Sequence, residues 1–175
     1  MGRRTTPPYR ADHVGSLLRP PELLRAREEH AAGRLDAQGL RAVEDEAIRA
    51  VVRMQEEVGL QSATDGEFRR ASWHMDFIYR LGGIHKAQDD LKVQFRNAEG
   101  TLEFTPAAAR VEERITLAEP IFADDFGFLQ DTVAAATPKL TVPSPSMVHY
   151  RGGRAAIAED VYPELDAFWA DLTAA

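Results

Sequence analysis

The sequence predicts an α/β fold in which about three parallel strands alternate with helices and an antiparallel β-hairpin or meander is inserted between them. Two observations lead to this prediction. Short apolar segments that end in polar turns alternate with helical patterns, and a strand, helix, strand order implies parallel strands with a right-handed crossover. Residues 91–117 instead alternate apolar and polar side chains, which is typical of antiparallel strands. We expect one domain over residues 1–175, with the insert at approximately residues 86–120.

The first elements follow a polar leader that contains two prolines. Residues Ala11–Val14 predict a short strand that runs into a turn at Gly15-Ser16. Pro20 and Pro21 then suit the first turn of a helix, where a missing backbone N–H costs nothing. This helix should end at Gly33.

A longer helix is predicted from residue 36 to residue 59. Asp36 is a suitable N-cap and Gly59 a suitable stop. Apolar residues recur between them at steps of three or four, which predicts one apolar stripe. A helix packed on a core explains this stripe without any further function. Its members are Leu40, Val43, Ala47, Val51, Met54 and Val58.

The remaining elements complete the α/β order. Residues 60–68 predict a second strand that breaks at Asp65-Gly66, and the antiparallel segment turns around Asn97–Gly100. A helix is expected over residues 124–136, followed by a third strand that ends in a Pro-Ser-Pro-Ser turn. The last helix has one apolar side, formed by Leu165, Phe168, Trp169 and Leu172.

Composition excludes several classes of function. Of the 175 residues, 44% are apolar, which suffices for one core of ordinary size. The formal charge of -7 argues against a nucleic-acid binder, and the absence of cysteine excludes disulfides, thiolate metal ligands and a cysteine nucleophile. The sequence contains no apolar run long enough for a membrane span and no apolar block typical of a secretory signal, so we expect a cytoplasmic protein.

Three polar segments follow the predicted strands: "DHVGS", "TDGEF" and "PSPSM". The carboxyl ends of parallel strands share one edge of a sheet, and ligands bind there. Asp65, Gly66 and Glu67 should therefore stand at the mouth of a site, with Arg69 and Arg70 able to balance charge or hold an anionic substrate. From the pattern alone, an ordinary acid-Gly-acid turn in a solvated loop is the favoured interpretation.

Three motifs, in this order, resemble the cobalamin-independent methionine synthase family, especially its short single-barrel members: "RADHVGSLLRP", "ATDGEFRRASWHMDF" and "PSPSMVHYRGGRAAI". The resemblance runs from about Tyr9 to the C-terminus and matches the first half of the catalytic barrel. It implies part of a TIM-like (β/α)8 barrel. It also implies a methyltransferase that uses zinc to activate a thiol, usually homocysteine, for methyl transfer from a methylated folate.

The resemblance also implies roles for individual residues. Gly15 and Ser16 resemble the loop that holds the carboxylate of homocysteine, and Glu67 resembles the acid that binds its ammonium group. His13 and Asp65 are expected beside these groups.

Further residues are expected on the folate side of the site. Trp73, His74 and Met75 are expected to form an apolar, partly aromatic wall for a flat group; a hydrophobic patch under the loop is the alternative. Ser144 and Ser146 are expected to face the same mouth, although Ser-Pro turns are often merely structural.

The sequence departs from the family pattern in its metal ligands. The family's zinc ligands, a His-x-Cys pair, a Glu and a distant Cys, belong to later strands, and this chain has no cysteine and only scattered histidines. A full barrel also needs about 250 residues. We therefore expect a split enzyme: this chain supplies the amino-acid-binding half and is inactive without a second polypeptide that completes the barrel and carries the zinc. The alternative is a non-catalytic module that closes by self-association or by folding its insert over the open edge, and binds a small molecule or a partner.

Overall fold

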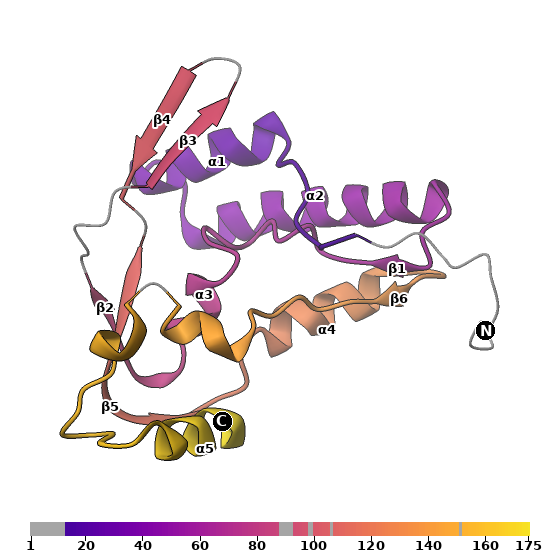
Figure 1. Ribbon diagram of the computed structural model, residues 1–175. Coiled ribbons are helices and arrows are strands. Elements are labelled where there is room, and N and C mark those ends of the chain that lie inside the picture. The colour runs from indigo at the N-terminus through magenta and orange to yellow at the C-terminus, as the bar shows by residue number, and fades with distance from the viewer. Residues whose placement is uncertain (1–12, 88–92, 98–99, 106, 151) are drawn as a thin grey trace. The chain divides into compact units, whose positions relative to one another are not determined.

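The computed structural model of the protein describes residues 13–87, 93–97, 100–105, 107–150 and 152–175 (Figure 1). These residues form two compact units. The first unit contains the described residues up to Ala71 together with Phe122–Thr141, and the second contains those of Ser72–Ile121 and Val142–Ala175. The predicted insert lies within the second unit, which extends beyond it on both sides. That residues 1–175 form one domain stays a prediction.

Two helices of the first unit begin as the sequence predicts. Helix α1 spans Pro21–Ala31, with Pro at its first position. Helix α2 spans Ala37–Glu57, and the carboxylate of Asp36 accepts a hydrogen bond of 2.7 Å from the backbone N–H of Gly39. Both helices therefore begin at residues whose chemistry suits a helix N-terminus.

The buried face of α2 lies about one residue away from the predicted stripe. Two predicted members, Met54 and Val58, are 41% and 66% exposed. Two polar side chains, Glu44 and Gln55, are buried instead. A hydrophobic pattern misses these positions because both polar groups have partners inside the unit. The residues on the buried face are Glu44, Ala47, Ile48, Val52 and Gln55.

A parallel strand pair confirms the α/β class. Strand β1 (Ser62–Ala63) pairs in parallel with strand β6 (Thr137–Pro138), with Ser62 opposite Thr137. Helix α4 (Ala123–Thr132) precedes β6 and packs its Leu129 into the core of this unit. The strand predicted at Ala11–Val14 falls partly outside the described residues, and its described part, His13 and Val14, is not in a strand.

The second unit contains the antiparallel pairs. Strand β2 (Gly82–Ala87) pairs with β5 (Ala108–Thr116), and β3 (Val93–Asn97) pairs with β4 (Gly100–Phe104). The second pair is the hairpin predicted around Asn97–Gly100. Strand β2 was not predicted; it begins with two glycines and has a register shift between Gly82 and Ile84.

Short helices complete the second unit. Helix α3 (Met75–Ile78) precedes β2 in the chain, and two 3₁₀ turns, Pro145–Val148 and Gly153–Ala156, follow β6. Helix α5 (Leu165–Ala174) packs its buried Phe168 into the core. The apolar side predicted for the last helix is confirmed. In the part of the chain that the structure describes, no helix combines the length and the apolar character that a bilayer crossing requires.

Candidate functional site

The acid-Gly-acid segment forms a tight turn directly after β1. The backbone N–H of Phe68 donates to the carbonyl of Asp65 at 3.3 Å. The two residues between them have positive φ angles, 68° at Gly66 and 60° at Glu67. Glycine adopts this conformation freely, whereas a residue with a Cβ atom is strained there by about 1–2 kcal/mol.

Several contacts hold Glu67 in its strained conformation. Its backbone N–H donates to Oδ1 of Asp65 at 2.9 Å, and its carbonyl accepts from Nη2 of Arg19 at 3.0 Å. Its side-chain Oε1 accepts from the hydroxyl of Thr141 at 2.8 Å and lies 3.8 Å from Nη1 of Arg70. Strain that neighbouring groups maintain in this way is typical of functional sites.

The Gly15 loop is bound to the same turn. The hydroxyl of Thr64 donates to the carbonyl of Gly15 at 2.7 Å, and the N–H of Leu17 donates to the carbonyl of Gly66 at 3.1 Å. Gly15 has a φ of 131°, and a Cβ atom there would lie 2.3 Å from Cγ2 of Thr141. Ser16 lies between these two anchored residues and is exposed. The structure thus brings the Gly15 loop and the Glu67 turn together within the first unit.

The acidic side chains of the turn are buried. Asp65 is 6% and Glu67 3% exposed. Burial raises the pKa of Asp65, and this effect outweighs the opposing hydrogen bond from the Glu67 N–H and the charge of Arg70. A buried carboxyl group with a raised pKa is typical of a candidate functional site.

Arg69 and Arg70 are engaged within the protein. Arg69 pairs with Asp45 of α2 and, at 3.1 Å, with Asp125 of α4, and its guanidinium lies 4.5 Å from the ring centroid of Phe128. Arg70 donates to the carbonyl of Thr141 at 2.8 Å. Of the two roles considered for them, these contacts favour charge balance over the binding of an anionic substrate.

His13, the last candidate of the first unit, is half-buried at the start of the Gly15 loop. Its carbonyl accepts a hydrogen bond from the Nζ of Lys139, the residue that follows β6. The His13 backbone is therefore fixed to the strand pair that carries the turn.

The predicted wall lies in the second unit. Trp73 is 50% exposed, and its ring centroid lies 4.4 Å from that of the buried His74. His74 Nδ1 lies 3.2 Å from the hydroxyl of Ser72. Met75 belongs to the hydrophobic core of this unit, in line with the alternative of a hydrophobic patch.

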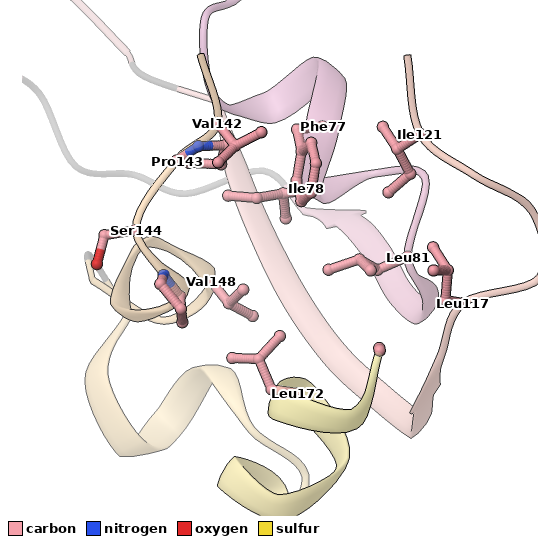
Figure 2. Close-up of a pocket in the computed structure, with 12 residues that line it drawn as sticks. Phe77, Ile78, Leu81, Leu117, Ile121, Val142, Pro143, Ser144, Val148 and Leu172 are labelled. Atoms are coloured by element: carbon pink, nitrogen blue, oxygen red, sulfur yellow. The ribbon is translucent and has the colours of Figure 1, made fainter. Parts of the chain in front are cut away.

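Ser144 and Ser146 are exposed, and their hydroxyl oxygens lie 3.0 Å apart. Ser144 also lines a cavity of about 370 Å³ within the second unit (Figure 2). The rest of the lining is almost entirely apolar, and Figure 2 shows Phe77, Ile78 and Leu172 pointing into it. The folate-side roles of these residues stay predictions.

The residues present do not fit a zinc site. The chain lacks cysteine, and among the described residues no three His, Asp or Glu side chains gather closely enough to hold a metal ion. The acids nearest the turn are instead paired with arginine or with backbone N–H groups.

Three residues of the site were not found from the sequence. Arg19 and Thr141 contact Glu67, and Gln55 hydrogen-bonds both backbone groups of Thr64. Gln55 had no signal, because a hydrophobic pattern assigns a polar residue beside an apolar stripe to the exposed face. Arg19 and Thr141 are distant in sequence from the turn and had none.

Comparisons with known proteins agree with the motif resemblance. No protein-family model matches the chain. The uncharacterized protein YxjG of Bacillus subtilis is 40% identical over 150 residues, covering 86% of this chain and 39% of YxjG. A methionine synthase of Sulfurisphaera tokodaii is 28% identical over 132 residues, covering 75% of this chain and 37% of that protein.

A solved structure from Listeria monocytogenes, of a protein assigned as a vitamin-B12-independent methionine synthase, has a TM-score of 0.75 and 34% identity. The match covers 98% of this chain and 47% of that one. The chain thus spans about half the length, or less, of the relatives that it matches. The chain belongs to the cobalamin-independent methionine synthase family and matches a half of that family's barrel.

Proposed function

We propose that the Gly15 loop and the Glu67 turn bind the two charged ends of an amino-acid thiol such as homocysteine. The single observation that carries this proposal is the strained Glu67, held by four contacts in a turn that is itself hydrogen-bonded to the Gly15 loop. An α-amino acid has one charge of each sign, so a hydroxyl-bearing loop beside a carboxylate matches its chemistry.

Within this proposal, Glu67 holds the ammonium group. Both described contacts of its carboxylate, with Thr141 and with Arg70, use Oε1. Oε2 is then the oxygen that receives the ligand's N–H. Ser16, exposed between the anchored Gly15 and Leu17, donates its hydroxyl hydrogen to the ligand's carboxylate, with His13 and Asp65 beside these groups.

We further propose that the whole activity is methyl transfer to this thiol from a methylated folate, and that this chain contributes the amino-acid-binding half. The zinc ligands then lie outside these 175 residues, on a second polypeptide that completes the barrel. The absence of cysteine supports this division, because the family's pattern requires cysteine ligands. Trp73, His74, Met75, Ser144 and Ser146 remain the candidates for the folate side.

Calorimetric titration of the whole chain with L-homocysteine tests the proposed site. The wild-type protein should bind, and Glu67→Gln should weaken binding about tenfold or more, because a charged hydrogen bond is replaced by a neutral one. Glu57→Gln, the same change at the exposed end of α2, is the matched control and should bind as wild type. Wild-type protein that binds no homocysteine would contradict the proposal.

A second candidate function is a non-catalytic binding module. It is favoured by the missing cysteines and by the lack of a metal-binding group among the described residues. Addition of zinc, methylfolate and the polypeptide that completes the barrel separates the two functions: a split enzyme should then produce methionine, whereas a module binds homocysteine without turnover.

A further inference from the structure

Gln55 is a fully buried polar side chain on the core face of α2, with 0% of its surface exposed. All of its hydrogen-bonding groups are used. Its amide nitrogen donates to the carbonyl of Thr64 at 2.9 Å and to the carbonyl of Val51 at 3.0 Å, and its amide oxygen accepts from the Thr64 N–H at 3.0 Å. A buried amide satisfied in this way is stable only if Thr64 keeps its position.

The contact with Thr64 replaces that of a neighbouring strand. An amide side chain presents the same donor and acceptor as a peptide group, so it pairs with both backbone groups of one residue as an adjacent strand does. Strand β1 ends at Ala63, so Gln55 extends the pairing to Thr64, the residue that precedes the turn. Helix α2 runs beside β1 in the first unit, which allows this reach (Figure 1).

Thr64 connects this pairing to both loops of the candidate site. Its hydroxyl donates to the carbonyl of Gly15 at 2.7 Å and accepts from the N–H of Gly66 at 3.2 Å. Because Thr64 is itself fully buried, no water can replace these bonds without a rearrangement. Through these two bonds, the position of the Thr64 backbone determines where Gly15 and the Glu67 turn lie.

We propose that Gln55 is a positioning residue that sets the placement of the Gly15 loop relative to the Glu67 turn. Its role in ligand binding rests on the proposed function, whereas its effect on the two loops does not. The residue touches no substrate. It acts through Thr64, and so determines whether Ser16 and Glu67 reach opposite ends of one ligand.

Four substitutions separate positioning from general stability. Gln55→Met keeps the size of the side chain and removes its bonds to Thr64. Val52→Ala lies one turn earlier on the same buried face and creates a cavity without changing a hydrogen bond of Thr64. Gln38→Met makes the same chemical change at an exposed position of α2. Thr64→Val, nearly identical in shape, removes only the hydroxyl and serves if Gln55→Met does not fold.

Hydrogen exchange of single amides is the first measurement. Gln55→Met should lower the protection of the Leu17 and Gly66 amides at least about tenfold more than that of the Val133 amide at the end of α4. Val52→Ala should lower all three about equally, and Gln38→Met should change none. Thr64→Val should also lower the protection of the Leu17 and Gly66 amides. Equal loss at all three amides in Gln55→Met, or unchanged Leu17 and Gly66 amides in either site variant, would overturn the inference.

Titration with L-homocysteine is the second measurement. Gln55→Met should bind about tenfold more weakly than Val52→Ala when both are measured under conditions where each is fully folded. Equal affinities would overturn the positioning role. If wild-type protein binds no homocysteine, the proposed function fails, and the exchange experiment alone decides the effect of Gln55 on the two loops.

Discussion

The hydroxyl of Thr141 donates a 2.8 Å hydrogen bond to Oε1 of Glu67, 74 residues earlier in the chain. This bond joins the segment that follows β6 to the turn that follows β1. Since these two strands pair in parallel, their carboxyl ends lie at the same edge of the pair. The bond connects the two segments at that edge and fixes the Glu67 carboxylate there.

Removal of the Thr141 hydroxyl should affect binding more than folding. In Thr141→Val, Oε1 of Glu67 keeps only its contact with Arg70, so the carboxylate is less well oriented. We expect about tenfold weaker homocysteine binding and a stability loss of about 1 kcal/mol, measured by titration and by urea unfolding. Thr132→Val, where the hydroxyl bonds only a carbonyl within α4, should leave binding unchanged. A Thr141→Val protein with wild-type affinity would contradict this role.

Gly66→Ala should destabilise the protein by about 1–3 kcal/mol. Gly66 has a φ of 68°, and an added Cβ atom would lie 2.8 Å from the Phe68 ring. Gly127→Ala is the contrasting variant, because Gly127 lies inside α4 with nothing within 4 Å of the added atom. It should be neutral or stabilise by up to about 1 kcal/mol. Thermal unfolding of both variants checks the prediction, which fails if the two behave alike.

Tyr162→Phe should weaken the attachment of α5 to β5 in the second unit. The Tyr162 hydroxyl accepts from the Ile115 N–H at 2.7 Å and donates to Asp171 of α5 at 2.7 Å, while Arg114 of β5 also pairs with Asp171. Its loss leaves a buried N–H without a partner, so we expect a cost of about 1–3 kcal/mol in urea unfolding. Tyr150→Phe, at a residue that is 69% exposed, is the control and should cost almost nothing.

Glu56 should make stability depend on acidic pH. The backbone N–H groups of Ala136, Ala135 and Ala134 donate to its carboxylate and lower its pKa from the usual 4.5. A carboxylate with a lowered pKa stabilises the folded state above its unfolded pKa, and this contribution is lost as pH falls through the folded pKa. The stability difference between wild type and Glu56→Gln should therefore shrink below about pH 4.5. Urea unfolding between neutral pH and pH 3 measures it; a difference independent of pH would contradict the assignment.

The sequence predicts the local elements well where one residue determines them. Asp36 caps α2, Pro21 starts α1, and the Asp65-Gly66 break ends β1, because each depends on backbone chemistry within a few residues. The three motifs also indicate the family and the two loops of the site. The contact of Gly15 with the turn is expected from a strand at Ala11–Val14, but the described part of that segment, His13 and Val14, is not in a strand.

The partners of the site residues are not predictable in the same way. Arg69 and Arg70 contact Asp45, Asp125 and Thr141, which are 24 to 71 residues away, and no local pattern encodes such pairs. The one-residue offset of the α2 face has a related cause. Burial of Glu44 and Gln55 depends on partners in other segments, whereas a hydrophobic pattern reads only the side chain itself.

The most direct test of the central claim compares two ligands on two proteins. L-homocysteine and its deaminated analogue, which keeps the thiol and the carboxylate, are titrated into wild-type and Glu67→Gln protein. If Glu67 holds the ammonium group, the substitution should weaken homocysteine binding about tenfold or more and leave the binding of the analogue unchanged. Equal losses for both ligands, or no loss for homocysteine, would contradict the account.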